Sequence, residues 1–475
     1  MNTLLNGADL AAISPLLIVL AAALGMLLLE SFFPKRVRKF AFGFTVAALF
    51  IAVIAAFFAP ASTNELLIPW LYFDSLARFF ALLFLGIGLC SAFLTASFFK
   101  HFEVSQGEYY FFLLSSLFGL LLVGAAADFL TLFLGLETLS IALYILTGYM
   151  KKWTISSEAA IKYLLTGAFS TAFFLYGVAL IYGAVGTTHF ASLLAAYQNI
   201  PEAGPSQALF LGGIALITLG LAFKAAIVPF HVWAPDVYEG SSNPAAAFMA
   251  VGTKAGAFAA FARLFLIALP QFNLAWSDVL TTLAIITMIY ANFVALRQLQ
   301  LRRFFAYSGI AHAGYLLIAI IVGTPAALPA LQFYLVVYSL STFGAFSVLA
   351  FLDKSAEGVL IDDLRGLFHR APFLAVVLTL SLLTLAGMPP TAGFFAKFYL
   401  FKIAFETGHI TLVIVALLAT VLSVFYYLRI ISWMFSQNKD ALIQPSCVWP
   451  AFAVAIATFA ALCILSLYPD ALLKT

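Results

Sequence analysis

The sequence predicts an all-α polytopic membrane protein with about fourteen transmembrane helices, and three observations support this prediction. Hydrophobic residues make up 64% of the 475 residues, whereas charged residues make up only 9%. A soluble globular chain carries about 25% charged residues. The mean hydropathy is +1.09, and apolar runs of about 20 residues, the length that crosses a hydrocarbon core, recur along the chain. We therefore expect a single integral membrane domain over residues 1–475.

Fourteen apolar runs separated by polar breaks are the predicted spans. Their limits are 14–32, 40–60, 74–98, 109–125, 127–149, 157–183, 208–234, 242–269, 277–296, 303–322, 326–350, 371–402, 408–433 and 448–468. The longest connection, residues 184–207, has weak helical character. No segment is long enough to form a separate soluble domain.

Basic residues between the spans predict the orientation of the chain. The loops after odd-numbered spans hold fifteen Lys and Arg residues, whereas the loops and terminus on the other side hold only Arg78 and Lys474. Cytoplasmic loops of membrane proteins are enriched in Lys and Arg, so we expect the odd-span loops in the cytoplasm and both termini outside. The first span lacks a preceding basic segment and a small-residue cleavage site, and is therefore expected to be a transmembrane helix rather than a removed signal.

Several classes of function are disfavoured by composition. The formal net charge is only +3, and no basic patch is dense enough to bind nucleic acid. Cys90, Cys447 and Cys463 lie far apart, without metal-ligand spacing or a disulfide framework. The sequence also lacks a nucleotide-binding fingerprint, an iron–sulfur Cys cluster and a haem-type His pair. We therefore expect no metal, no cofactor and no redox chemistry in this chain.

Two predicted spans are interrupted by proline. Span seven contains Pro229 and Pro235, and span twelve contains Pro389 and Pro390. Proline breaks the helical hydrogen-bond ladder, and in lipid such breaks survive only where they are buried in protein or line a wet cavity. The two broken spans are five apart in chain order and so run in opposite directions, which is typical of inverted repeats. This pattern divides the domain into N-terminal helices (1–105), a first five-helix repeat (106–270, spans 4–8), a second, inverted repeat (276–433, spans 9–13) and a last helix (448–468).

Five charged side chains lie within the predicted spans and away from their outer ends, where Arg263 and Lys402 can reach the membrane surface. They are one mid-span carboxylate and four lysines: Glu137, Lys162, Lys224, Lys254 and Lys397. A charge at the bilayer centre costs from about 2.5 to more than 10 kcal/mol, and burial disfavours the charged form of either residue type, so neighbours decide the protonation state. We expect a proton relay in which Glu137 pairs with Lys224. Structural pairs that only fix helix packing are the alternative.

Two histidines are further candidates for the relay. His231 lies at the break of span seven, and His312 lies in the middle of span ten. Each either passes protons near neutral pH or serves as a hydrogen-bonded structural side chain. Lys162 lies only five residues into span six, so it either reaches toward the membrane surface or acts on Glu137.

The segment PDVYEGSSNP, residues 235–244, is expected to be a cytoplasmic loop because it is rich in turn-forming residues. Its carboxylates, Asp236 and Glu239, would then lie at the entrance of the relay. They either feed protons to the lysines or belong to a capping turn before span eight. The sequence leaves both interpretations open.

A family resemblance rests on five motifs in this order: LGLETLS, SSEAAIKYLLTGAFSTAFFLYGVALIYG, GLAFKAAIVPFHVWAPDVYEG, LRRFFAYSGIAHAGYLL and LAGMPPTAGFFAKFY. Together they resemble the antiporter-like proton-pumping subunits of respiratory complex I, and among these the N-type subunit (subunit 2) of bacterial NADH–quinone oxidoreductase. The resemblance is strong over residues 105–430. The run from Phe223 to Asp236 by itself would indicate only the wider family, which includes Mrp-type cation antiporters.

By this resemblance, each candidate residue takes a role. Glu137 matches the fifth-helix glutamate, and Lys224 matches the seventh-helix lysine that pairs with it. Lys254 matches the central eighth-helix lysine, Lys397 the twelfth-helix residue at the exit, and Lys162 the sixth-helix lysine near the glutamate. His231 and His312 match polar relay positions along the central axis. A proton would reach Lys254 from the cytoplasm near the span-seven break and leave through Lys397 near the span-twelve break.

The resemblance also implies the setting of this chain. The whole complex would transfer electrons from NADH to quinone and move protons outward, with NADH, FMN, iron–sulfur clusters and quinone bound by other subunits. Partners would be the M- and L-type antiporter-like subunits, small helical subunits and the lipid bilayer of a bacterial inner membrane. The alternatives are a subunit of an Mrp-type sodium/proton antiporter or of a membrane-bound hydrogenase, and a purely structural membrane scaffold.

Overall fold

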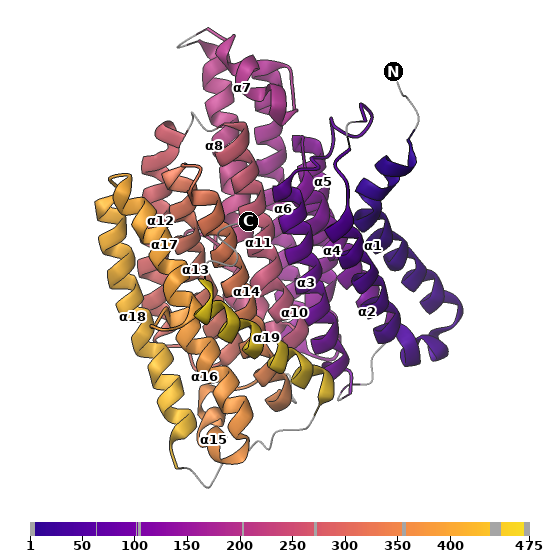
Figure 1. Ribbon diagram of the computed structural model, residues 1–475, viewed down its shortest axis with the longest axis vertical. Coiled ribbons are helices and arrows are strands. Elements are labelled where there is room, and N and C mark those ends of the chain that lie inside the picture. Colours follow the sequence, from indigo (N-terminus) through magenta and orange to yellow (C-terminus); the bar gives the residue numbers. More distant parts are fainter. Residues whose placement is uncertain are drawn as a thin grey trace.

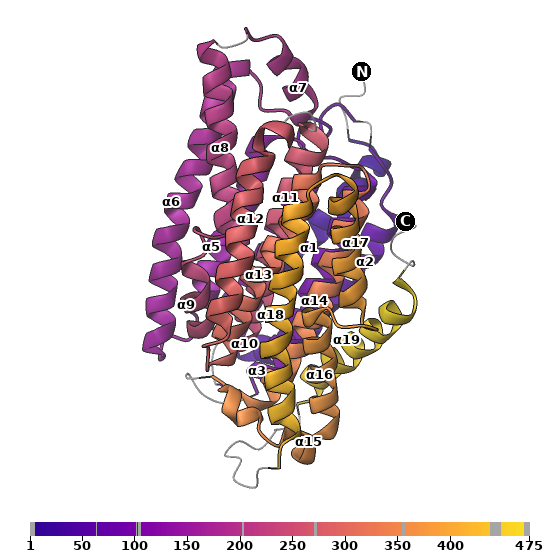
Figure 2. The ribbon, with the colours of Figure 1, turned by 90° about the vertical axis from the view of Figure 1, so that its left-hand side faces the viewer.

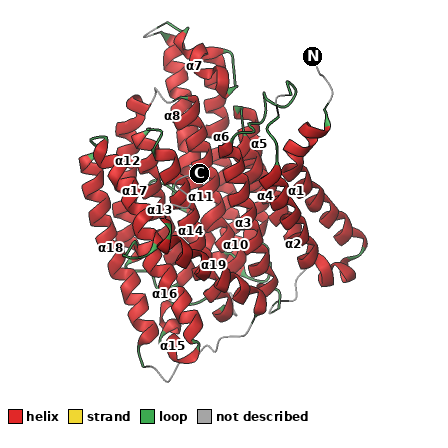
Figure 3. Cartoon of the chain, in the orientation of Figure 1, coloured by secondary structure: helices red, strands yellow, loops and turns green. Residues whose placement is uncertain are grey.

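The described part of the computed structural model comprises residues 5–62, 64–100, 102, 106–201, 204–269, 273–353, 358–437 and 448–469. It is a bundle of helices, and within these ranges strand-like pairing is limited to three isolated bridges (Figure 3). The predicted all-α fold is thus confirmed. Cys447 and Lys474, which entered the sequence argument, lie outside the described residues.

The first half of the chain runs from α1 to η2 (Figure 1). Its helices are α1 (Gly7–Phe32), α2 (Pro34–Phe58), α3 (Ser75–Phe98), α4 (Gly107–Ala125), α5 (Phe129–Thr147), α6 (Thr154–Val185), α7 (Phe190–Gln198), α8 (Pro205–Ala225), α9 (Trp233–Gly240), α10 (Asn243–Phe248), the π-helical η1 (Met249–Thr253), α11 (Lys254–Phe261) and the π-helical η2 (Ala262–Ala268). The stretch from α10 to η2 is one continuous helical span of changing pitch.

The second half of the chain is also built from long helices. Its elements are α12 (Asn273–Ala295), α13 (Leu301–Val322), α14 (Ala327–Leu352), the 3₁₀ turn η4 (Ile361–Leu364), α15 (Leu367–Arg370), α16 (Pro372–Ala386), α17 (Ala392–Glu406), α18 (Ile410–Phe435) and α19 (Trp449–Leu467). Within the described residues, thirteen helical stretches are long and apolar enough to cross a membrane. The two shorter helices α16 and α17 together cover the remaining predicted span.

Both predicted helix breaks are present, with one boundary moved. Helix α8 ends at Ala225 rather than near residue 234, because the next residue, Ala226, has a left-handed φ of 58°. Helix α16 ends at Ala386, and Gly387 follows it with φ 78°. In chain order, the broken pair α8–α9 is the fourth span after residue 106, and α16–α17 is the fourth span after residue 276, which fits the two proposed repeats.

The expectation of a loop at residues 235–244 was wrong. Residues 233–240 form α9, and α10 begins at Asn243. Pro235 occupies the first turn of α9, and Pro244 occupies the first turn of α10. Backbone N–H groups in a first helical turn have no intrahelical partner, so proline is tolerated there. The turn-forming composition therefore reflected two helix starts.

The connection 184–207 contains α7, in agreement with its weak helical character. Helix α6 has 32 residues, which corresponds to about 48 Å and exceeds the roughly 30 Å of a hydrocarbon core. The ends of α6 and α8, with α7 between them, extend beyond the other helices in both views (Figures 1 and 2).

The core of the bundle is formed by its central helices. Residues 243–268, α13 and α14 are buried along nearly their whole length, whereas α1, α2, α6, α12 and α18 expose apolar side chains on one face. Helix α19 crosses the bundle obliquely and packs against α14 and α3 (Figure 1). The central helices carry Lys254 and His312, so these two candidate relay residues lie where lipid has no access.

Candidate functional site: a row of buried lysines

Glu137 and Lys224 line the same small cavity between α5, α6 and α8. Its volume is about 10 Å³, roughly what one water molecule needs. The Thr171 hydroxyl donates to the Glu137 carboxylate at 2.6 Å, and the Lys224 ammonium donates to the Ser140 hydroxyl at 2.5 Å. Within the described residues, no ion pair shorter than 4.0 Å joins Glu137 to Lys224. The structure thus brings the predicted pair into one cavity without direct contact.

The helix break places Lys224 at the end of α8. Lys224 lies in the last turn, where free carbonyl groups carry partial negative charge that favours a cation. The Trp233 indole N–H donates to the Phe223 carbonyl at 2.9 Å, so α9 satisfies part of the open helix end. His231 lies in the same break, with its ring centroid 4.9 Å from that of Tyr290. It lines neither of the small cavities that hold Lys224 and Lys397.

Lys254 lies between two π-helical segments. Helix η1 ends at Thr253, directly before Lys254, and η2 begins at Ala262. Single π-helical turns are rare and are frequent at functional sites. The Ala250 carbonyl in η1 accepts a hydrogen bond of 3.0 Å from the Tyr338 hydroxyl. The changed pitch therefore gives α14 a direct polar contact one turn from the lysine.

The Lys254 ammonium is deeply buried and has few polar neighbours. Its exposed fraction is 1%, and it donates to the Tyr238 hydroxyl at 3.4 Å. A Cβ atom on Gly309 would lie 3.0 Å from the Lys254 Nζ and 2.9 Å from the Tyr338 hydroxyl. Glycine at this position of α13 therefore leaves the space that the ammonium occupies.

Lys397 reaches back from α17 to the end of α16. Its ammonium donates to the Ala386 carbonyl at 2.9 Å and lies 4.6 Å from the centroid of the Tyr315 ring. His312 shares a hydrogen bond of 2.8 Å with the Tyr334 hydroxyl. Lys397, His312, Tyr334 and Tyr338 line a second cavity of about 10 Å³, again roughly one water in size. The structure therefore brings His312 and Lys397 together.

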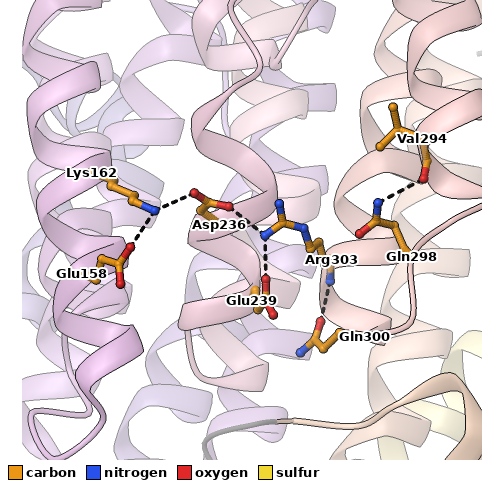
Figure 4. Close-up of polar contacts among 8 residues, drawn as sticks. All are labelled: Glu158, Lys162, Asp236, Glu239, Val294, Gln298, Gln300 and Arg303. Atoms are coloured by element: carbon orange, nitrogen blue, oxygen red, sulfur yellow. Dashed lines mark hydrogen bonds and ion pairs between the residues drawn. The ribbon is translucent and has the colours of Figure 1, made fainter.

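Lys162 lies in an ion-pair network at the lysine- and arginine-rich end of the bundle (Figure 4). Its ammonium is 2.7 Å from Glu158 and 2.8 Å from Asp236, and the Arg303 guanidinium is 2.8 Å from Asp236 and 2.7 Å from Glu239. These contacts join α6, α9 and α13. We call these five residues the ionic clamp.

The position of Lys162 on α6 does not support the expected contact with Glu137. Thr171, which hydrogen-bonds Glu137, follows Lys162 by nine residues on α6, and these correspond to about 13 Å along the helix. That distance exceeds the reach of a lysine side chain. Of the two interpretations, the structure favours the one in which Lys162 reaches toward the membrane surface.

The ionic clamp also bears on the interpretation of Asp236. Burial raises the pKa of this carboxyl, but the hydrogen bond from Lys162 and the positive charge of Arg303 outweigh burial, so the pKa lies below its usual range. Asp236 is therefore a carboxylate at neutral pH and a poor proton acceptor. This favours a structural role over the feeding of protons to the lysines.

Several groups around the lysines were missed by sequence reasoning. They are the π-helical turns, the tyrosines Tyr238, Tyr334 and Tyr338, and the glycines Gly309 and Gly387. One signal was available, since Lys254 lies in the run VGTKAGAFAAFA, whose small residues allow close approach of neighbouring helices. The tyrosines come from helices distant in sequence, and no local pattern marks them.

Comparisons with known proteins agree with this architecture. Residues 126–423 match the family described as NADH:quinone oxidoreductase/Mrp antiporter, TM. The NADH-quinone oxidoreductase subunit N of Protochlamydia amoebophila is 55% identical over 475 residues, covering 100% of this chain and 98% of the relative.

Solved structures give the same result. A chain of respiratory complex I from Thermus thermophilus has 32% identity and a TM-score of 0.82, covering 97% of this chain and 99% of that chain. A chain of the Mrp complex from a Dietzia species has a TM-score of 0.84 over 98% of this chain and 96% of that chain, but only 20% identity, which is a likeness of fold. The chain therefore belongs to the NADH:quinone oxidoreductase/Mrp antiporter family, and within it to the subunit N proteins of NADH-quinone oxidoreductases.

Proposed function

We propose that this subunit translocates protons through a relay formed by Glu137, Lys224, Lys254, His312 and Lys397. The observation that carries the proposal is the burial of three lysine side chains in the bundle core, each with an exposed fraction of at most 4%. A charge in such a place is costly, so an ionisable side chain inside a membrane span points to a functional site. Two of the lysines share water-sized cavities with another titratable group, Glu137 or His312.

Glu137 is the proposed trigger of the relay. Because the carboxylate and the Lys224 ammonium share a cavity without touching, each feels the charge of the other in a medium of low dielectric constant. An ionised Glu137 then holds the proton on Lys224, and a neutral Glu137 releases it toward Lys254. Lys397, at the second helix break, would hand the proton to the opposite side of the membrane.

The exposure of Glu137 supports a partner on this face of the subunit. In the isolated chain Glu137 is only half-buried, and its neighbours on the outer face of α5, Leu134 and Ile141, are 58% and 54% exposed. A mid-span carboxylate next to lipid is strongly unfavourable. We therefore propose that another membrane subunit of the complex, rather than lipid, covers this face.

The family and the charge pattern support a setting for the relay. We propose that the chain acts within a proton-translocating NADH:quinone oxidoreductase of a bacterial inner membrane, with the odd-span loops in the cytoplasm and both termini outside. The chain itself would carry no redox step, and NADH, FMN, iron–sulfur clusters and quinone would bind to other subunits. M- and L-type antiporter-like subunits and small helical subunits would be its neighbours.

The test uses the purified complex reconstituted in liposomes, with quinone reduction and proton uptake measured together. Lys224→Ala, Lys254→Ala and Glu137→Ala are expected to lower the number of protons moved per quinone reduced. Lys402→Ala is the matched control, because Lys402 is exposed and, among the described residues, its ion pair is with Glu406 at 3.8 Å. Full proton transport and full quinone reduction in Lys224→Ala would overturn the proposal.

Two alternatives are separated by the same preparation. A sodium/proton antiporter subunit would lose transport in sodium-free medium, whereas the proposed relay would not. A structural scaffold would tolerate neutralisation of Glu137 and Lys254 with no loss beyond assembly. The subunit N relatives favour the proposed relay over both.

A further inference from the structure

We propose that Tyr144 and Tyr163 carry protons between Lys224 and Lys254, as hydroxyl groups of a buried path that ends at Tyr238. The inference rests on the proposed function, because it supplies the connection between two lysines of that relay. Its geometry is independent of the mechanism and comes from seven side chains on α5, α6, α8, α9 and α11.

The path begins at Lys224. Its ammonium donates to Ser140 at 2.5 Å and lies 6.0 Å from the centroid of the Tyr144 ring. Tyr144 follows Ser140 by four residues on α5, so both side chains lie on the same face of the helix. The Tyr144 hydroxyl then reaches the backbone of α6 at Gly167, where a Cβ atom would collide with it. Gly167 therefore opens the space into which this hydroxyl projects.

Tyr163 continues the path one turn along α6. Its ring centroid is 4.8 Å from that of Tyr144, with the rings at 87°. The other side of the Tyr163 ring stacks on Trp233, with the ring centroids 4.5 Å apart and an angle of 7° between the ring planes. Trp233 lies 6.3 Å from Tyr238, whose hydroxyl accepts a hydrogen bond of 3.4 Å from Lys254. An unbroken row of aromatic residues thus connects the surroundings of the two lysines.

Two hydroxyl groups in this row are buried and unsatisfied. Within the described structure, neither the Tyr144 nor the Tyr163 hydroxyl makes a hydrogen bond of normal geometry, although the Ser140 hydroxyl lies close to that of Tyr144. Tyr163 is completely buried. An unsatisfied buried hydroxyl is unfavourable, and phenylalanine would fill the same space without this cost. Two adjacent unsatisfied hydroxyls therefore indicate a transient hydrogen-bond partner. Between two lysines of a proton relay, we infer that this partner is a water molecule that carries a proton.

The chemistry of each step is balanced. A phenol oxygen accepts a proton from a neighbouring hydrated proton or ammonium while its own proton passes to the next oxygen, so the tyrosine is unchanged after one transfer. The only co-reactant is water. A proton that leaves Lys224 arrives at Lys254, and no electron moves.

Tyrosine-to-phenylalanine variants test the path without removing a ring. Tyr163→Phe and Tyr144→Phe keep the stacking and delete only an unsatisfied hydroxyl, so assembly is expected to be unchanged and thermal stability to equal or exceed that of the wild type. Tyr110→Phe is the matched control, because Tyr110 is also fully buried but donates to Ala92 at 3.3 Å on α3. All variants are measured in the reconstituted complex beside Lys254→Ala.

The expected result is a fall in protons moved per quinone reduced in both tyrosine variants, to the level of Lys254→Ala, since a lost proton-transfer group slows its step by about 100-fold or more. Tyr110→Phe should keep the wild-type ratio. A wild-type ratio in both Tyr163→Phe and Tyr144→Phe overturns the tyrosine path. A wild-type ratio in Lys254→Ala overturns the proposed function instead.

Discussion

The Lys397 ammonium donates a 2.9 Å hydrogen bond to the carbonyl of Ala386, the last residue of α16. A second lysine, Lys224, lies in the last turn of α8, the first half of the other broken span. Both breaks thus bring an ammonium group to the negative end of a half-helix, where a cation is favoured by about 0.3–1 kcal/mol or more. This shared arrangement links the two helix breaks to the buried lysines.

The first prediction concerns Gly387, which follows Ala386. A Cβ atom here would lie 2.7 Å from the Lys397 Cδ, whereas one on Gly408 would have no neighbour within 4 Å. Both glycines have a left-handed φ, 78° and 86°, so alanine costs both about 1–2 kcal/mol of backbone strain. Gly387→Ala should therefore lower both thermal stability and proton transport, and Gly408→Ala only stability. Equal transport in the two variants would contradict the predicted packing of Lys397.

The second prediction concerns the space that Gly309 leaves for Lys254. Gly309→Ala would crowd the ammonium and the Tyr338 hydroxyl, and overpacking of a core costs about 1–3 kcal/mol. We expect reduced stability and reduced proton transport. Gly43→Ala, in α2 with open space around it, should instead stabilise by about 0.5–1 kcal/mol. Thermal unfolding and proton uptake of the same preparations check both, and unchanged transport in Gly309→Ala would refute the close packing of Lys254.

The third prediction is a pH dependence of the ionic clamp. Because the pKa of Asp236 is lowered in the folded chain, its stabilisation is complete above the unfolded pKa of about 3.9 and is lost as the pH falls through the lower folded value. Asp236→Asn should therefore destabilise by about 0.2–1 kcal/mol per lost pair at neutral pH, and the difference should close below about pH 4. Thermal unfolding from pH 8 to the acid limit measures it.

The same variant tests the two interpretations of Asp236. If Asp236 serves only the ionic clamp, Asp236→Asn keeps the wild-type number of protons per quinone, and added salt narrows the stability difference by screening the pairs. If Asp236 feeds protons to the relay, transport falls at every pH. A loss of transport at neutral pH with unchanged stability would show that the structural interpretation is wrong.

The fourth prediction concerns a buried arginine outside the relay. Arg263 has an exposed fraction of 1% and binds Asp74 through both terminal nitrogens, at 2.5 and 2.7 Å. Asp74→Asn would leave that charge without its counter-ion, a change that costs about 3–5 kcal/mol when both partners are buried. Because Asp74 is 42% exposed, we expect a smaller loss in thermal unfolding. The double variant Arg263→Leu with Asp74→Asn should be more stable than Asp74→Asn alone. If it is not, the uncompensated charge of Arg263 is not the cause of the loss of stability.

Much of the architecture was determined by the sequence alone, for a physical reason specific to membranes. In lipid every backbone polar group needs an internal partner, so long apolar runs become helices and prolines within them become breaks. The predicted spans, the interruptions near Pro229 and Pro390, and the single carboxylate Glu137 among buried lysines all follow from composition along the chain. The placing of these charges inside the bundle follows from the cost of exposing them to lipid.

The tertiary structure alone decided which of these groups meet. Lys162 and Glu137 lie on neighbouring helices, but Glu137 lies beside Thr171, nine residues beyond Lys162 on α6. Lys162 therefore pairs with Asp236, and Glu137 accepts a hydrogen bond from Thr171. The segment 235–244 is largely helical, and its prolines are tolerated because they fall in first turns. The composition of the segment does not encode where those turns begin. The tyrosine row from Tyr144 to Tyr238 joins α5, α6 and α9, and such contacts depend on side-chain directions that only the packed helices define.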